Sequence, residues 1–310
     1  MYDRILVPLD GSPLAEQVLP FVTRISHGMG VPIHLMRVFA TVSEELTDPV
    51  HGLYRSDIMA GVHDEVMDYL NGVRLKMEPP GLEITCEAYE GEAAPHIIEE
   101  AEKTPKSLVS MSTHGRSGVT RWLMGSVTDR VLHATKNPML IVRGRSEGDP
   151  EPDTKLETII VSVDGSSLAE QVIPHVTALA NAMELKVTLL RAGASENELQ
   201  DIAGYQHADG PPGMKFQHFE EMAKEAGNRA LDYLVGLEGS LRKHGVASVE
   251  HRIEKGPAAD VIVDVAHETP DNLVAMTTHG RSGPARWTQG SVTGRVVSHS
   301  GDPVLVVRVG

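Results

Sequence analysis

The chain repeats two blocks of sequence, and the copies lie about half a chain length apart. Residues 10–20 read DGSPLAEQVLP, and residues 164–174 repeat them as DGSSLAEQVIP. A second block, THGRSG, begins at Thr113 and again at Thr278, and both copies run on to Gly-Ser-Val-Thr. Solenoid repeats have periods of about 20 to 50 residues, far shorter than this one. The sequence therefore predicts two copies of a whole domain.

Bulk composition sets limits on the partners of these domains. The 310-residue chain is 41% hydrophobic and 23% charged, as in ordinary globular proteins, and each half is long enough to bury a core. No apolar run reaches the length of a membrane span. A net charge of −15 disfavours nonspecific nucleic-acid binding. We therefore expect neither a membrane nor a nucleic-acid partner.

The expected location follows from two further features of the sequence. Cys86 is the single cysteine, so no internal disulfide can form. The N-terminal residues lead directly into an apolar run rather than into a signal peptide. Both features are typical of a protein of the reducing cytoplasm, and we expect a cytoplasmic location.

Apolar runs alternate with helical periodicity in both halves. The first runs, 5–7 and 159–161, end at Asp-Gly-Ser turns and suit strands buried on both faces of a parallel sheet. A helix is expected directly after each turn, because Leu14, Val18 and Phe21 have helical spacing. Four more strands are expected in each half, at 31–39, 82–89, 108–112 and 139–142, and at 185–191, 246–253, 273–277 and 304–307. The other expected helices include long ones at 57–76 and 219–244, and shorter ones ending near 104 and 269 and spanning 127–134 and 292–299.

This alternation predicts the fold class of each half. A chain in which strands and helices alternate favours an α/β domain with a parallel sheet, helices on both faces and right-handed crossovers. We expect one domain at 1–144 and another at 156–310. A linker rich in Gly, Pro, Asp and Glu is expected at 145–155.

The second repeated block has the residue types of an anion site. It follows a predicted strand and opens a helix, with Gly115 and Gly280 able to adopt positive φ. The pairs at 125–126 and 290–291, Gly-Ser in both halves, stand at the helix starts. Free N–H groups and the helix dipole attract anions there. Positive φ is also expected at Gly125. The alternative is that the serines are only N-caps and the glycines only turns.

The first repeated block places Asp10 and Asp164 at the carboxyl ends of the first strands. Open α/β sheets bind ligands at this edge, where a carboxylate can accept hydrogen bonds from a ribose or an adenine amino group. The alternative is an Asx turn that caps the next helix. Arg116 and Arg281, within the glycine loops, either meet phosphates or remain solvated.

The sequence contains no catalytic constellation. It lacks the Walker, dinucleotide-binding, zinc-protease and nucleophile-elbow motifs, and its 15 histidines show no zinc-ligand spacing. We expect no catalytic residue and no metal site.

Both halves resemble the universal stress protein family, and the chain looks like a tandem two-domain member. The family's ATP-binding members carry Gly-x-x-Gly, nine residues and then Gly-Ser or Gly-Thr. Here Gly115 and Gly280 match the second glycine, and the nine-residue spacing is kept. Ser112 and Thr277 replace the first glycine, so their side chains either narrow the phosphate approach or add a hydroxyl to it.

The resemblance implies a fold, a ligand and a role. The fold is a Rossmann-like five-stranded parallel α/β sandwich of strand order 3-2-1-4-5 in each half, and the two halves pair through their fifth strands as an intrachain pseudo-dimer. A homodimer is left open. The ligand is ATP or AMP, with Mg left open. The role is regulatory or stress-protective; the alternatives are a structural or interaction stress protein that binds no nucleotide, or a slow ATPase.

The nucleotide-binding residues implied in this way include Val38 and Ala192, which match a residue after strand two that contacts adenine. In the first half the full set is Asp10, Val38, Ser112, Gly115, Arg116, Gly118, Gly125, Ser126 and Val127. In the second half it is Asp164, Ala192, Thr277, Gly280, Arg281, Gly283, Gly290, Ser291 and Val292.

Overall fold

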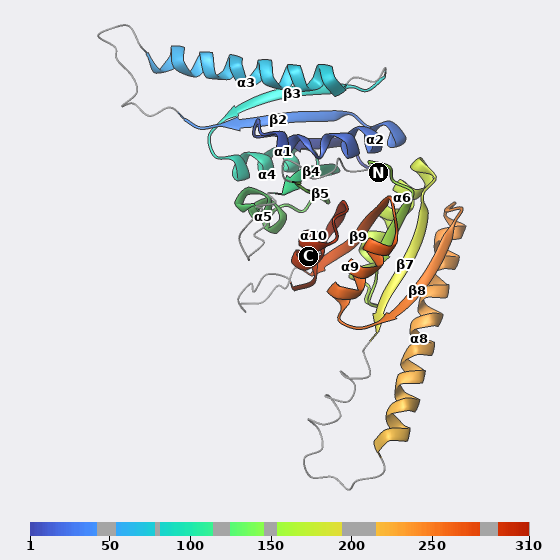
Figure 1. Cartoon of the computed structure of the whole chain (residues 1–310). Coiled ribbons are helices and arrows are strands. Elements are labelled where there is room, and N and C mark those ends of the chain that lie inside the picture. The colour runs from blue at the N-terminus through green and yellow to red at the C-terminus, as the bar shows by residue number, and fades with distance from the viewer. Residues whose placement is uncertain are drawn as a thin grey trace. The chain divides into compact units, whose positions relative to one another are not determined.

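The computed structural model describes residues 1–41, 54–77, 81–113, 125–145, 154–193, 215–279 and 291–309. The chain forms two compact units, Met1–Thr154 and Lys155–Gly310. In both units strands and helices alternate, and every pair of neighbouring strands within a unit is parallel (Figure 1). The predicted α/β class with two parallel-sheet domains is confirmed.

The N-terminal unit has the strand order β3-β2-β1-β4-β5. Its strands are β1 (Arg4–Pro8), β2 (Ile33–Phe39), β3 (Ile84–Glu90), β4 (Ser107–Thr113) and β5 (Met139–Arg143). Its helices are α1 (Pro13–Glu16), α2 (Leu19–Met29), α3 (Arg55–Met77), α4 (Ala93–Lys103) and α5 (Ser126–Ala134).

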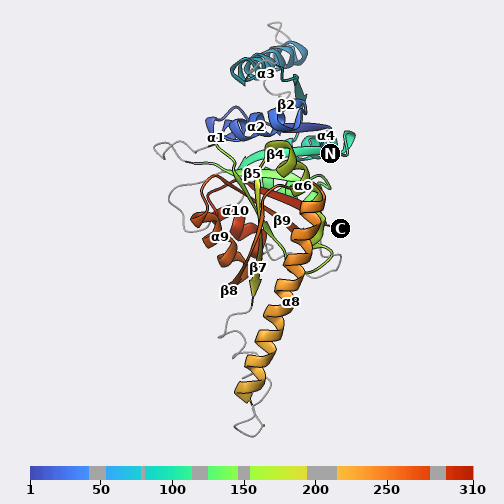
Figure 2. The same cartoon turned by 90° about the vertical axis from the view of Figure 1, so that its right-hand side faces the viewer.

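The C-terminal unit repeats this arrangement with the order β8-β7-β6-β9-β10. Its strands are β6 (Thr158–Ser162), β7 (Lys186–Gly193), β8 (Val249–Lys255), β9 (Asn272–His279) and β10 (Val304–Val309). Its helices are α6 (Ile173–Met183), α8 (Lys215–Lys243), α9 (Ala258–Glu268) and α10 (Ser291–His299), and a 3-10 turn, η3 (Ala169–Val172), precedes α6. The long helix α8 packs on β8 and β7 (Figure 2).

Helices cover both faces of the N-terminal sheet. On β3, Cys86 Sγ contacts the carbonyl oxygen of Leu70 in α3 at 3.6 Å. Three residues further along, Tyr89 donates a hydrogen bond to Glu100 of α4 at 2.9 Å. Because successive strand residues point to opposite faces, α3 and α4 lie on opposite sides of the sheet. The central strands β1 and β6 are accordingly apolar and fully buried at 5–7 and 159–161.

The helix expected after each Asp-Gly-Ser turn is two pieces rather than one. In the N-terminal unit α1 ends at Glu16, and α2 begins at Leu19 with a proline in its first turn. Pro20 lacks a backbone N–H, which a continuous helix would require there. Pro174 takes the same place in the first turn of α6. A proline fits the first turn of a helix, so the helix breaks just before it in both units.

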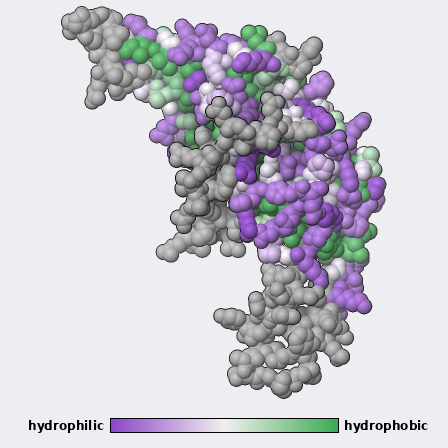
Figure 3. All heavy atoms as spheres, in the orientation of Figure 1, coloured by the Kyte–Doolittle hydropathy of each residue, from purple (hydrophilic) through white to green (hydrophobic). Residues whose placement is uncertain are grey.

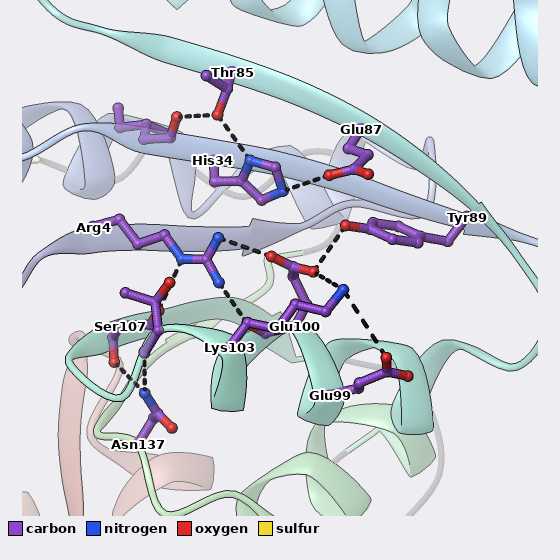
Figure 4. Close-up of polar contacts among 12 residues, drawn as sticks. Arg4, His34, Thr85, Glu87, Tyr89, Glu99, Glu100, Lys103, Ser107 and Asn137 are labelled. Atoms are coloured by element: carbon purple, nitrogen blue, oxygen red, sulfur yellow. Dashed lines mark hydrogen bonds and ion pairs between the residues drawn. The ribbon is translucent and has the colours of Figure 1, made fainter.

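A charged cluster around the buried carboxylate of Glu100 joins β1 to α4 in the N-terminal unit (Figure 4). Arg4 donates to Glu100 Oε1 at 2.8 Å and to Ser107 Oγ at 2.9 Å. The second carboxylate oxygen of Glu100 accepts from Tyr89 and Lys103, both at 2.9 Å. Glu100 is only 5% exposed. Three donors, from β1, from β3 and from the next turn of α4, thus stabilise one buried carboxylate.

The C-terminal unit replaces this ion pair by uncharged residues. Thr158 begins β6 as Arg4 begins β1, and Val265 occupies in α9 the place of Glu100 in α4. Both are buried. The same pair of positions in the fold is therefore occupied by an ion pair in the N-terminal unit and by uncharged residues in the C-terminal unit.

The face of the described surface drawn in Figure 3 is mainly polar. On the face drawn in Figure 3, hydrophilic residues cover most of the described part of both units, with small apolar areas between them. None of the helices in the described ranges combines the length and the apolar character that a bilayer span requires.

Candidate functional site

The strand registers gather predicted binding residues at one edge of each sheet. In the N-terminal unit, β1 pairs in parallel with β2 and β4, which brings Asp10, Val38 and Ser112 to nearly the same level. In the C-terminal unit, β6 pairs with β7 and β9 and does the same for Asp164 and Ala192. Ligands of open α/β sheets bind at this carboxyl edge. Thr277 of β9 belongs to the same edge and is 9% exposed.

Each aspartate closes an Asx turn. Asp10 Oδ1 accepts the backbone N–H of Ser12 at 2.8 Å, and Asp164 Oδ1 accepts that of Ser166 at the same distance. The glycine between them has φ near +90° in both units, which a residue with a Cβ rarely adopts. The Asx turn of the alternative prediction is thus confirmed, but its capping role is not: Ser12, rather than Asp10, is the N-cap of α1, and its Oγ accepts the Ala15 N–H at 3.1 Å. Both are exposed, and their contact with a ligand stays a prediction.

Ser112 uses its hydroxyl within the protein. Its Oγ donates a long hydrogen bond to the carbonyl oxygen of Ala15 in α1 at 3.4 Å. Its own carbonyl oxygen accepts a hydrogen bond from Thr128 Oγ1, also at 3.4 Å. These contacts place the first turn of α5 next to the end of β4. A contact between the Ser112 hydroxyl and a phosphate stays a prediction.

The start of α5 differs from expectation in two ways. Gly125 is the N-cap, and Ser126 is the first helical residue and is exposed. The expected positive φ at Gly125 is wrong: φ is −52° and ψ is 140°, because an N-cap residue takes extended rather than left-handed torsions. As a glycine, Gly125 has no side chain that could cap the first-turn amides. Val127 follows in the same first turn and is half-buried.

The corresponding residues of the C-terminal unit are only partly described. Ser291 begins α10, and Val292 is half-buried. Seven predicted site residues lie outside the described residues, so their roles stay predictions: Gly115, Arg116, Gly118, Gly280, Arg281, Gly283 and Gly290.

A group of residues near the aspartate turn escaped the sequence analysis. The guanidinium of Arg37, in β2, lies 4.9 Å from the ring centroid of Tyr69 in α3. The Tyr69 hydroxyl donates to Glu16 of α1 at 2.9 Å. Burial, followed by the hydrogen bond to Glu16, raises the pKa of Tyr69 above its usual range. The group thus ties β2, α3 and α1 together beside the predicted site.

The C-terminal unit has the same residue types in these places, but among the described residues the buried Tyr233 hydroxyl lacks the hydrogen bond that Tyr69 makes to Glu16. Arg191 lies 5.5 Å from the ring centroid of Tyr233, and burial and the carboxylates of Glu170 and Asp164 raise the pKa of Tyr233. A signal was present in the sequence: both halves keep Asp-Tyr-Leu, at 68–70 and 232–234, and an arginine near the end of the second strand.

Replacing Gly11 by alanine should destabilise its unit more than replacing Gly165 destabilises the other unit. Positive φ costs an L-residue about 1–2 kcal/mol in either unit. A Cβ on Gly11 would also lie 2.8 Å from three atoms of the Arg37 guanidinium, whereas one on Gly165 would lie 3.2 Å from Arg191 Nη1. We expect Gly11→Ala to lower the free energy of unfolding of its unit by about 1 kcal/mol more than Gly165→Ala lowers that of the other unit. Hydrogen exchange in denaturant measures this free energy for each unit separately. Equal costs would show that the guanidinium moves away freely.

The family model and the relatives described next are all universal stress proteins. A model described as the universal stress protein family matches residues 1–143 and 155–308. A universal stress protein of Mycolicibacterium smegmatis is 24% identical over 309 residues, covering 98% of this chain and 96% of that protein. One from Methanocaldococcus jannaschii is 30% identical over 143 residues, 46% of this chain and 83% of the relative.

Solved structures agree on the fold. The crystal structure of a universal stress protein from Archaeoglobus fulgidus superimposes with a TM-score of 0.69 and 20% identity, and the match covers 100% of both chains. The structure of a putative universal stress protein from Pseudomonas aeruginosa superimposes with a TM-score of 0.60 at 15% identity. The match covers 99% of this chain and 93% of the other. The family model matches one half and then the other, so this chain is a tandem two-domain member of the universal stress protein family.

Proposed function

We propose that each domain binds an adenine nucleotide, ATP or AMP, at the carboxyl edge of its sheet, and that the chain acts as a regulatory or stress-protective protein. The observation that carries this proposal is the start of α5. Gly125 opens the helix without a capping side chain, and Thr128 in its first turn bonds the end of β4. Unpaired amides at a helix N-terminus favour a phosphate.

The residues at the other strand ends suit the adenosine part of the ligand. Asp10 is an exposed acceptor on a turn fixed by its own hydrogen bond. Val38 is a half-buried aliphatic side chain at the same level in the neighbouring strand. A carboxylate acceptor beside an apolar surface can recognise the amino or hydroxyl groups of adenosine and the face of its base. Asp164 and Ala192 form the matching pair in the second domain.

Two further inferences accompany this function. A cytoplasmic location is supported by the single, half-buried Cys86, since disulfides are rare in reducing compartments. Pairing of the two domains through their fifth strands is proposed from sequence alone, because an apolar edge strand left bare is an aggregation hazard.

Gly125→Val should weaken ATP binding at the N-terminal site at least tenfold, or about 1.4 kcal/mol. The Cβ and its methyl groups would keep a phosphate away from the first backbone amides of α5. The measurement is calorimetric titration of the full chain in a Gly290→Val background, so that the N-terminal site is read alone. Gly290→Val by itself is the matched control for the C-terminal site. Unchanged affinity in a folded Gly125→Val variant would remove this helix start from the site.

A further inference from the structure

Each domain places an arginine directly under its Asp-Gly-Ser turn. An ideal Cβ on Gly11 would lie 2.8 Å from Cζ, Nη1 and Nη2 of Arg37, so the guanidinium occupies the space that a side chain on Gly11 would need. Arg191 lies below Gly165 in the same way, with its Nη1 3.2 Å from the ideal Cβ. The turn glycine therefore does two things: it accepts a φ near +90° and makes room for the cation.

The same guanidinium lies over an aromatic ring whose hydroxyl is hydrogen-bonded. Arg37 stacks within cation–π range of Tyr69, at 4.9 Å from the ring centroid. The Tyr69 hydroxyl is fixed by Glu16, in the short helix α1 that the turn begins. A planar guanidinium suits this position between a ring and a backbone turn better than the point charge of a lysine. The arginine is thus held between α3 and the turn.

Electrostatics link the aspartate to the same group. The Asp10 carboxylate raises the pKa of Tyr69 and the Arg37 guanidinium lowers it, after the larger effects of burial and Glu16. In the second domain Asp164 and Arg191 act on Tyr233 with the same opposite signs. The turn aspartate, the arginine and the tyrosine therefore lie within electrostatic reach of one another in both domains.

The arginine, tyrosine and glutamate beside the turn occur in both domains, which the ion pair Arg4–Glu100 does not. The buried pair Arg4–Glu100 stabilises one domain, and the other domain holds Thr158 and Val265 in those places. Stability alone does not require a given charge pattern in both copies. The arginine, tyrosine and glutamate, by contrast, recur together with the aspartate turn.

We propose that Arg37 and Arg191 are positioning residues that hold the turn aspartates in the orientation that receives the nucleotide. The part of this inference that concerns the ligand rests on the proposed function. In this arrangement the arginine acts on the turn, and its effect on the ligand passes through the aspartate. Holding an acceptor in place before binding reduces the ordering cost that binding must otherwise meet.

The first test needs no nucleotide and uses the full chain. The Ser12 amide bonds Asp10 Oδ1, so its hydrogen exchange, followed by NMR, reports how firmly the turn is held. We expect exchange at Ser12 to accelerate at least fivefold in Arg37→Met and less in Arg37→Lys, while Ser166 in the same molecule is unchanged. Arg191→Met should do the reverse. Unaltered exchange at Ser12 in Arg37→Met would overturn the proposal.

The second test separates positioning from direct contact. Arg37→Met should weaken the binding of adenosine and the binding of ATP by the same factor, about tenfold. In an Asp10→Asn background it should weaken binding no further. A loss confined to ATP would show a direct phosphate contact and overturn the positioning role. If the wild-type chain binds neither ligand, the proposed function fails, and the amide-exchange result alone decides whether the arginine holds the turn.

Discussion

Glu100→Val should destabilise the N-terminal domain by about 3–5 kcal/mol, because it leaves a buried arginine without its carboxylate. Arg4 is only 15% exposed in its side chain, and its ion pair with Glu100 is 2.8 Å long. Tyr89 and Lys103 lose an acceptor in the same step. The measurement is hydrogen exchange of the β1 amides in denaturant, which reads this domain without the other.

The C-terminal domain supplies the matched control for this prediction. The double variant Arg4→Thr with Glu100→Val copies the uncharged pair Thr158 and Val265. Replacing both members of a buried ion pair is often close to neutral, whereas removing one is costly. We expect the double variant to recover more than half of the stability lost in Glu100→Val. A double variant as unstable as the single one would show that the ion pair itself, and not the stranded charge, determines the cost.

Acid should destabilise the N-terminal domain by about 3 kcal/mol through the same carboxylate. Burial by itself would raise the pKa of Glu100, but hydrogen bonds from Lys103, Arg4 and Tyr89 outweigh it and lower the pKa from 4.5 to about 2. A depressed pKa stabilises the fold above the unfolded-state value and ceases to do so as the pH falls through the folded-state value. The loss should therefore occur between about pH 4.5 and pH 2.

Stability measured against pH in the double variant isolates this effect. Arg4→Thr with Glu100→Val removes the titrating carboxylate, so its stability should fall less over that interval than that of the wild-type domain. An identical pH dependence in both proteins would mean that other carboxylates dominate the acid response.

Much of the fold was predictable because its signals are local and occur twice. The apolar runs 5–7 and 159–161 are buried strands, and the expected helix ends near 104 and 269 are the C-caps of α4 and α9. Other features needed the structure. Gly30 closes α2 with φ of 65°, but Glu184 closes α6 with φ of 57°. A glutamate in that conformation carries no sequence signal, because glycine is the residue that normally supplies it.

The candidate site was predictable only where one segment carries the whole feature. The Asx turn at Asp10 is such a feature, since the aspartate bonds an amide two residues away. Arg37, Tyr69 and Glu16 come from three separate elements, and their meeting depends on strand register and helix rotation. The positive φ expected at Gly125 was wrong because the residue type alone does not distinguish an N-cap glycine from a turn glycine.

Calorimetric titration of the full chain with ATP decides whether each domain holds one nucleotide. Both domains keep the aspartate, the loop glycines and the helix-start serine. Thr277 adds a methyl group where the first domain has Ser112, so the two affinities are expected to differ. At ATP concentrations well above the weaker dissociation constant, we expect saturation at two equivalents per chain. Saturation at one equivalent would show that one domain is purely structural. If the folded protein bound no ATP, neither domain would be a nucleotide site.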